Sequence, residues 1–165
     1  MHLLGGLVAS YLFNNRVVAY FHDALCDLDV AKFSHARGDH TGQQTWEALA
    51  LLVALRLWAP LWKGKRVVIT VRSDSVSALS AALNLSSQGA NANMLAREMA
   101  LDIAESLYNP AVLAHIPGVC NVIADVLSRW HEPGKSRLLP APLRGASLQT
   151  PPPRVAAYYR AASPP

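Results

Sequence analysis

The pattern of apolar and polar positions begins with two strand-like runs. Residues 3–13 and residues 16–22 are rich in apolar, β-branched and aromatic side chains, and Asn14 and Asn15 between them are typical of a turn. The two runs therefore predict a β-hairpin. A signal peptide is the alternative interpretation of residues 1–13, but this run lacks a basic leading segment and a small-residue cleavage site.

The middle of the chain carries the strongest helix pattern. Residues 43–59 contain no glycine or proline and are dense in leucine and alanine, the best helix formers, and we expect Pro60 to end the helix. The polar residues 23–42 are ambiguous, with a short third strand expected near residues 31–35. The remaining expected elements are a buried strand at residues 66–72, a helix at 76–85, an amphipathic helix at 94–108, a strand at 111–116 and a closing helix at 119–130.

This order of elements predicts an α/β fold. A hairpin or meander followed by alternating helices and strands gives a mixed sheet, antiparallel at first and then parallel, with flanking helices. The 165 residues, of which 52% are hydrophobic and 16% charged, suit one domain with a core. No apolar run reaches the roughly 18–20 residues of a membrane-spanning helix, so we expect no membrane partner. Two cysteines are too few for a disulfide framework.

The formal net charge of +4 lies in the C-terminal segment. Residues 133–165 contain five basic residues and no acid, which leaves residues 1–132 with a net charge of −1. The same segment contains eight of the 11 prolines, which block helix and sheet. We expect a folded domain at residues 1–131 and an extended, mostly disordered tail at 132–165, either a phosphate-binding arm or a linker to a further segment.

Three acids stand next to apolar structure. Glu47 lies near the start of the apolar helix, Asp74 follows a buried strand, and Asp125 lies among apolar residues of the last helix. Each has an ordinary interpretation as a helix-capping or solvent-facing carboxylate. If they meet at one edge of a sheet, they form a hard-oxygen site suited to Mg²⁺ or Mn²⁺.

The segments around these acids carry a family resemblance. They are, in chain order, GGLVASYLFNNRVVAYFHDAL, GQQTWEALALLVAL, VRSDSVSAL and HIPGVCNVIADVLSR. The first is similar to an opening hairpin, the second to a helix that supplies a Glu, and the third to a strand-end Asp-Ser motif. The fourth has a Pro-Gly turn followed by Asn-x-x-Ala-Asp-x-Leu-Ser-Arg. In this order they resemble the ribonuclease H domains of retroelement reverse transcriptases, over about residues 3–130.

The resemblance implies hydrolysis of the RNA strand of an RNA–DNA hybrid by two divalent ions, Mg²⁺ or Mn²⁺, held by four carboxylates. Glu47, Asp74 and Asp125 match three of these ligands. His115 matches a histidine that assists proton transfer or product release, although a turn-flanking histidine is the simpler interpretation. The resemblance also implies an intracellular protein and an upstream reverse transcriptase domain in the same polyprotein. Expected nucleic-acid contacts are Arg72, Ser73, Ser75, Asn121 and Arg129.

The first metal ligand of the family is missing. It is an Asp on the first strand, shortly before a glycine pair, and here Gly5 and Gly6 place it before Met1. The nearby acids Asp23 and Asp27 follow the second strand, and Asp39 is a weak candidate. Either the chain is a fragment of a longer polyprotein or it is a degenerate copy without activity. Both explanations predict a short first strand with an unpaired edge.

The resemblance favours ribonuclease H activity, but the missing ligand leaves open whether this chain is an enzyme. A catalytically inactive structural or binding module with the same fold is one alternative. An integrase-type or exonuclease-type nuclease is another, against which the Ala-Asp-x-Leu-Ser-Arg signature argues. The simplest alternative is an α/β domain whose acids are helix caps.

Overall fold

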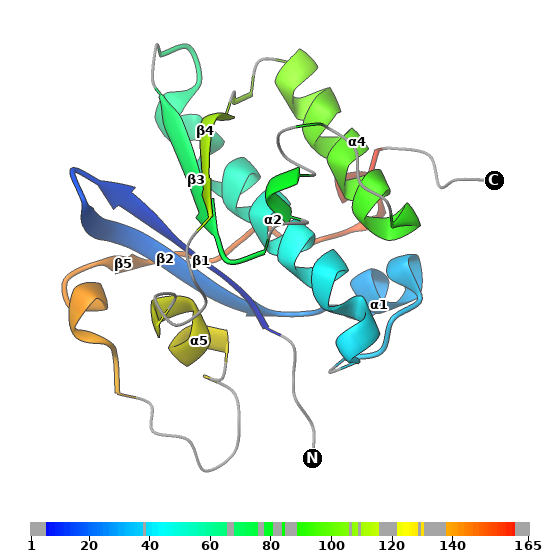
Figure 1. The fold of residues 1–165 in the computed structure, drawn as a ribbon, viewed down its shortest axis with the longest axis horizontal. Coiled ribbons are helices and arrows are strands. Elements are labelled where there is room, and N and C mark those ends of the chain that lie inside the picture. The colour runs from blue at the N-terminus through cyan, green and yellow to red at the C-terminus, as the bar shows by residue number, and fades with distance from the viewer. Residues whose placement is uncertain are drawn as a thin grey trace.

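The computed structural model gives a mixed α/β fold in which helices pack on both faces of a hairpin (Figure 1). The structure describes residues 6–37, 39–65, 68–75, 78–80, 84, 89–105, 107–108, 110–115, 122–128, 130 and 138–160. None of the helices in these ranges is long and apolar enough to cross a membrane.

The expected opening hairpin is confirmed. Strand β1 (Gly6–Phe13) pairs antiparallel with β2 (Arg16–Ala24). Asn14 and Asn15 have φ angles of 50° and 59°, the left-handed pair that tight hairpins need and that asparagine tolerates. A two-residue strand, β5 (Ser147–Leu148), pairs parallel with β2, so the order of this mixed sheet is β1-β2-β5.

The hairpin has two apolar faces, because successive strand residues point to opposite sides. Leu7 and Phe21 pack in the larger core cluster, which also contains the long helix α2 (Gln43–Trp62). Tyr20 faces the other way, into a smaller cluster with Leu127 and Leu143. Leu127 belongs to the short helix α5 (Val122–Ser128), so α2 and α5 lie on opposite faces of the hairpin.

Helix α1 (Asp27–Phe33) occupies the region where a third strand was expected near residues 31–35, so that prediction is wrong. The backbone N–H of Cys26 donates to Asp29 Oδ2 at 2.9 Å, a capping contact that stabilises the first turn. Local capping here outweighs the weak strand signal of a polar stretch.

Helix α2 begins where the leucine and alanine pattern predicts, but it passes Pro60 and ends at Trp62. Proline removes only the bond to the carbonyl four residues back, and the last turn is still closed by Lys63 N–H donating to the Ala59 carbonyl at 2.9 Å. The expected stop at Pro60 is therefore two residues early. Eleven of the 20 residues of α2 are buried, as expected for a helix apolar on nearly every side.

The second half contains the expected strands and helices, with shifted ends. Strands β3 (Ile69–Ser73) and β4 (Pro110–His115) pair in parallel, and among the described strands they form a second sheet. Residues 78–80 and 84 are helical. Helix α4 (Ala90–Ala104) begins four residues earlier than the predicted helix 94–108 and packs on α2.

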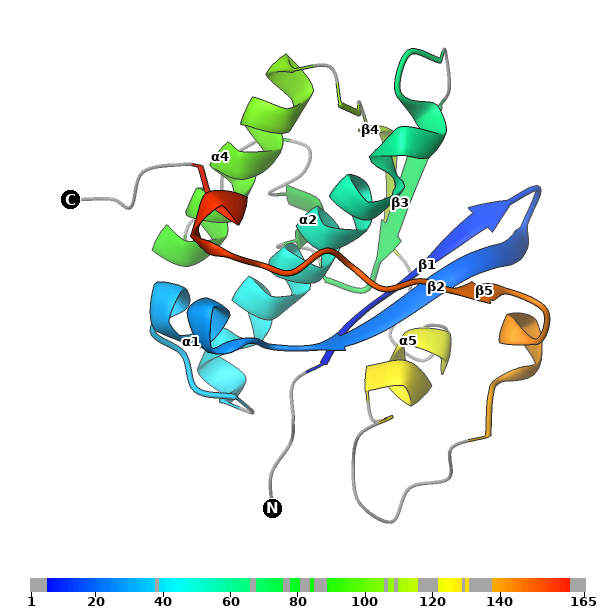
Figure 2. The same ribbon diagram turned by 180° about the vertical axis from the view of Figure 1, so that it is seen from behind.

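The C-terminal strap, defined as residues 138–160, is packed on the rest of the molecule. It contains a 3-10 turn (Ala141–Leu143), β5 and a second 3-10 turn (Ala156–Tyr158). Figure 2 shows it running from β5 across α2 towards α4. Leu143 is fully buried, and Arg154 and Tyr159 are each 7% exposed. The expectation of a disordered tail does not hold for these residues, because their prolines fit an extended path and their apolar and arginine side chains find partners on the body.

Candidate functional site

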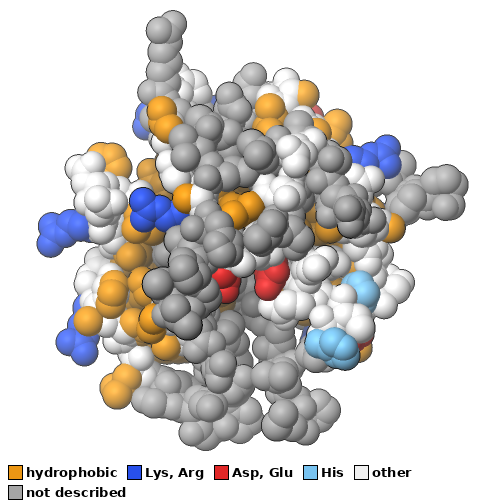
Figure 3. All heavy atoms as spheres, viewed as in Figure 1, with side chains coloured by type: hydrophobic (Ala, Val, Ile, Leu, Met, Phe, Trp, Pro, Cys, Tyr) orange, Lys and Arg blue, Asp and Glu red, His pale blue; other side chains and the backbone are white. Residues whose placement is uncertain are grey.

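Parallel pairing places Asp74 beside the end of β4. Ser73, the last residue of β3, is in register with His115, the last residue of β4. Asp74 follows directly and is exposed. Because the carboxyl ends of parallel strands share one edge, Asp74 and the segment that leads from His115 towards α5 start from the same place. Figure 3 shows acidic side chains near the middle of the face that it displays, without identifying them by residue.

The turn that carries Asp74 is held by its two flanking serines. Ser73 Oγ accepts the backbone N–H of Ser75 at 3.0 Å, and Ser75 Oγ accepts the N–H of Ala78 at 3.2 Å. Ser75 is only 8% exposed and caps the helical residues that follow. Arg72, on β3, is exposed. The turn therefore holds its own shape while Asp74 faces outwards.

Glu47 lies in the second turn of α2 and is half-buried. Its Oε1 accepts the side-chain amide of Gln43, one turn earlier, at 2.9 Å. This contact engages one carboxylate oxygen.

The remaining predicted site residues are placed only in part. Asp125 lies within α5 and His115 ends β4, but their side chains fall outside the described structure, as do Asn121 and Arg129 entirely. Within the side chains that are described, no group of three or more His, Cys, Asp or Glu is placed to hold a metal ion. Convergence of Glu47, Asp74 and Asp125 therefore stays a prediction.

The acids considered as replacements for the missing carboxylate have other contacts. Asp23 Oδ2 lies 2.6 Å from Arg154, and Asp27 Oδ1 lies 2.6 Å from Arg37. Asp39 accepts the Thr41 hydroxyl at 2.7 Å and the Thr41 backbone N–H at 2.9 Å, and these hydrogen bonds hold the pKa of Asp39 below its usual value. Each of these carboxylates therefore has a structural partner.

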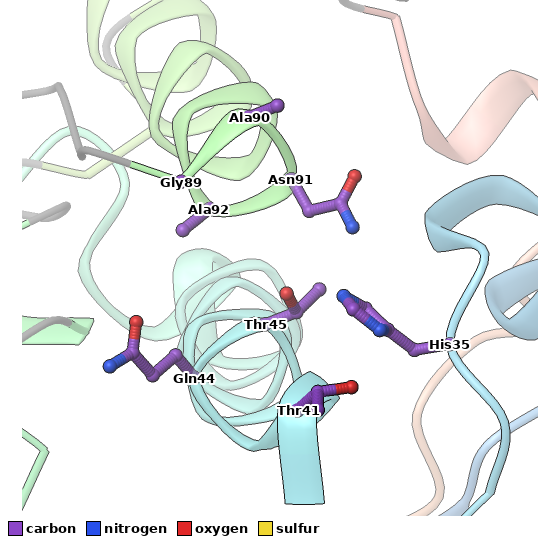
Figure 4. A pocket seen from close by; sticks show the side chains of 8 residues that line it. All are labelled: His35, Thr41, Gln44, Thr45, Gly89, Ala90, Asn91 and Ala92. Carbon is purple, nitrogen blue, oxygen red and sulfur yellow. The ribbon is translucent and has the colours of Figure 1, made fainter. Parts of the chain in front are cut away.

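A pocket of about 170 Å³ lies between the starts of two long helices. Figure 4 shows side chains from three parts of the chain around it: the segment after α1, the start of α2 and the start of α4. The volume corresponds to several water molecules at about 30 Å³ each, enough for a small anion. The lining residues are His35, Thr41, Gln44, Thr45, Gly89, Ala90, Asn91 and Ala92.

The chemistry of this pocket favours an anion. Gly89 precedes α4 and offers no side chain to cap its first N–H groups, which point out of the helix start together with the positive end of the helix dipole. Thr45 is 5% exposed, and its hydroxyl-bearing side chain lines the pocket. Asn91 is fixed by its Nδ2, which donates to the Phe33 carbonyl at 2.7 Å. His35 can add a further donor.

One wall of the pocket depends on a glycine. A Cβ at Gly42 would lie 2.8 Å from His35 Cβ and 2.8 Å from Trp46 Nε1. The rings of His35 and Trp46 pack edge to face, with centroids 6.0 Å apart. Sequence reasoning missed this pocket, although a signal was present in the two glycines, 42 and 89, that precede helices beginning with Gln and Thr or with Asn.

No family model, curated protein or solved structure matches this chain. The fold and the described side chains define a mixed α/β domain with an exposed strand-end carboxylate and a small polar pocket between helix starts.

Proposed function

We propose that this chain is a ribonuclease H-like nucleic-acid-binding domain of the retroelement reverse transcriptase type. Its substrate would be the RNA strand of an RNA–DNA hybrid, hydrolysed when the missing first-strand Asp is supplied. The observation that carries the proposal is the parallel pairing of Ser73 with His115, which starts Asp74 and the segment leading to Asp125 from one sheet edge. The ordered sequence motifs support the same assignment.

The proposed roles of the residues follow from their places. Glu47, Asp74 and Asp125 offer hard oxygen ligands to Mg²⁺ or Mn²⁺, ions that polarise a phosphate oxygen and lower the pKa of bound water. Arg72 is exposed on the strand that leads to Asp74, where it can contact a phosphate. His115, at the end of the neighbouring strand, is the proposed proton-transfer group.

In this proposal the pocket at the start of α4 binds a phosphate of the nucleic-acid backbone. A phosphate there would accept the free N–H groups of the first turn and the hydroxyl of Thr45, with Asn91 and His35 beside it. Such contacts position a nucleic acid without reading its sequence. This suits a hybrid, because A-form duplexes are recognised mainly by shape, phosphates and 2′-hydroxyls.

The fourth carboxylate could come from a further strand that pairs at a strand edge. Among the described strands, β1 ends its sheet, and β3 has only β4 as a neighbour. An extended segment carrying an Asp and pairing at these edges would complete the ligand set. The upstream reverse transcriptase domain and the intracellular location belong to the same proposal.

A non-catalytic hybrid-binding module is the second candidate. The polar pocket at the start of α4 and the exposed Arg72 support it, because neither contact with a duplex needs a metal ion. In that case the pocket and Arg72 would still contact the duplex, and added metal would not lead to cleavage.

Cleavage of a labelled RNA–DNA hybrid with Mg²⁺ or Mn²⁺ tests both candidates. The 165-residue chain is compared with a version that carries an additional N-terminal strand with an Asp. We expect binding by both and cleavage by the longer version, reduced by about 10²-fold or more in Asp74→Asn, since charge stabilisation is the largest catalytic contribution. Asp27→Asn is the matched control, because that side chain is 96% exposed and pairs with Arg37.

Two results would contradict the catalytic proposal. The first is a longer version that binds the hybrid but never cleaves it, which selects the binding module. The second is unchanged cleavage in Asp74→Asn, which would assign the activity to other residues or to a contaminant.

A further inference from the structure

The strap is anchored on α1 by a buried arginine. The Arg154 side chain is 3% exposed, and its Nε lies 2.9 Å from Asp29 Oδ2. Its Nη1 donates to Asp23 at 2.6 Å and its Nη2 to the Ala24 carbonyl at 2.7 Å. Charge-assisted hydrogen bonds of this kind are stronger than neutral ones. The strap is therefore fixed at the start of α1.

A second anchor joins the strap to α2 and α4. Arg56 of α2 donates to Glu98 and Asp102 of α4, each at 2.7 Å, and to the carbonyl of Tyr158 in the strap at 2.5 Å. Arg160 extends this network to Asp102 and Glu105. The strap thus contacts α1, α2 and α4, the same three elements that lead into the pocket.

Tyr159 connects the strap to α1 through Asp29 and Phe33. Its hydroxyl donates to Asp29 Oδ1 at 2.5 Å. Its ring packs edge-on against Phe33, the last residue of α1, with centroids 5.5 Å apart. Phe33 also packs edge-on against Trp46, at 5.9 Å. Phe33 is 1% exposed, so its position depends on these ring contacts.

Phe33 connects the strap to the pocket directly. Its carbonyl accepts the side-chain amide of Asn91 at 2.7 Å, and Asn91 lines the pocket. His35, another lining residue, lies two positions further along the chain. Displacing the Phe33 ring would therefore move both the acceptor of Asn91 and the segment that carries His35.

We propose that Tyr159 of the strap is a positioning residue for the pocket and acts on Asn91 through Phe33, so that docking of the strap sets the affinity for a backbone phosphate. This inference rests on the proposed function of the pocket. Tyr159 does not itself contact the anion. It fixes the residue whose carbonyl holds Asn91.

The test combines hybrid binding with a direct view of Asn91. Affinity for a labelled RNA–DNA hybrid is measured without divalent metal, so that cleavage does not contribute. The variants are Tyr159→Leu, which keeps an apolar side chain, Asn91→Ala and the double variant. Val155→Ala is the matched control, since Val155 is a strap residue that is 58% exposed. The side-chain amide resonances of Asn91 are recorded in the full chain by NMR.

We expect Tyr159→Leu to weaken hybrid binding by about 3- to 30-fold, the range of reported coupling effects, and to shift the Asn91 side-chain resonances. In the Asn91→Ala background the same change should have a much smaller effect on affinity, because Asn91 is gone and only the segment that carries His35 can still shift. Val155→Ala should leave both measurements unchanged.

Two results would overturn the coupling: unchanged Asn91 resonances in Tyr159→Leu, or losses of affinity that simply multiply in the double variant. Unchanged hybrid affinity in Asn91→Ala alone would instead overturn the phosphate pocket, and the affinity part of this inference with it. A shift of the Asn91 resonances would still show the structural link, so the two failures are distinguishable.

Discussion

Arg56 and Asp102, 46 residues apart in the chain, form a two-bonded ion pair in which Nε lies 2.7 Å from Oδ2 and Nη2 lies 3.0 Å from Oδ1. Asp102 is fully buried, and Tyr108 also donates to its Oδ2 at 2.7 Å. This pair joins α2 to α4. The two helices that frame the pocket are therefore held together by charge as well as by apolar packing.

Replacing Arg56 should be strongly destabilising. Arg56→Met keeps the length of the side chain but leaves Glu98 and Asp102 buried with one arginine fewer. We expect a loss of about 3–5 kcal/mol in the free energy of unfolding, measured by urea denaturation, because an uncompensated buried charge is costly. Asp27→Asn, at an exposed pair, should cost no more than about 1 kcal/mol. Equal losses in the two variants would contradict the role of the buried pair.

Gly42 should not tolerate a side chain. In Gly42→Ala the new Cβ would meet His35 Cβ and Trp46 Nε1, each at 2.8 Å, so the pocket wall must shift. We expect destabilisation of about 1–3 kcal/mol, as for other overpacked sites, and weaker hybrid binding. Gly89→Ala is the control for stability alone, since the nearest atom to its Cβ would be 4.0 Å away. A Gly42→Ala chain that unfolds and binds like the original would show that the wall is not tightly packed.

The hydroxyl of Thr45 should contribute to hybrid binding regardless of base sequence. Thr45→Val keeps the shape of the side chain and removes the group available to a phosphate. A hydrogen bond to a charged partner is worth about 1.5–3 kcal/mol, so we expect roughly a tenfold or greater loss of affinity, equal for hybrids of different sequence. Thr150→Val, at an exposed strap position, should bind normally. A loss confined to one sequence would indicate base contacts instead.

Alkaline pH should unfold the protein partly through Tyr158. Burial raises the pKa of Tyr158 to about 12, although the nearby charge of Arg56 lowers it in part. The unfolded chain has a tyrosine pKa of about 10, so the folded state holds this proton more tightly. The resulting stabilisation is complete below about pH 10 and is lost as the pH rises through about 12.

Tyr158→Phe isolates this effect. The Tyr158 hydroxyl is buried with no hydrogen-bond partner among the described residues, so its removal should leave stability at neutral pH equal or slightly higher. Above about pH 10 the variant should lose stability less steeply than the original chain. Urea denaturation across this pH range, with tyrosinate absorbance recorded in parallel, gives both quantities. An identical pH dependence in the two chains would contradict the assignment.

Local signals predicted the hairpin and α2, because their information is contained in short stretches of sequence. Asn14 and Asn15 specify the turn directly, and leucine and alanine specify the helix. The α1 region was missed because its stability depends on one capping carboxylate, Asp29, which also binds the distant Arg154. The strap was missed for the same reason: proline content describes a local preference, whereas its order comes from distant partners such as Asp29, which lies 125 residues from Arg154.

The sequence likewise predicted some features of the candidate site and not others. Sequence placed Asp74 after a strand and Glu47 near a helix start, and both positions are confirmed. It did not predict that Asn91 would meet Phe33, since a side-chain bond across 58 residues has no local signature. Pockets between helix starts arise from packing angles that composition does not encode.

The short strand β5 has a consequence for handling this protein. It pairs with the outer edge of β2 at Ala19 and Tyr20, and Gln149 N–H also donates to the Tyr20 carbonyl at 2.9 Å. Unpaired strand edges are templates for association with other chains. A version shortened to residues 1–131, the expected folded domain, would expose this edge together with the apolar surface beneath Leu143. Self-association of such a shortened chain would then reflect the loss of the strand that covers this edge, and would be no evidence about how the 165-residue chain assembles.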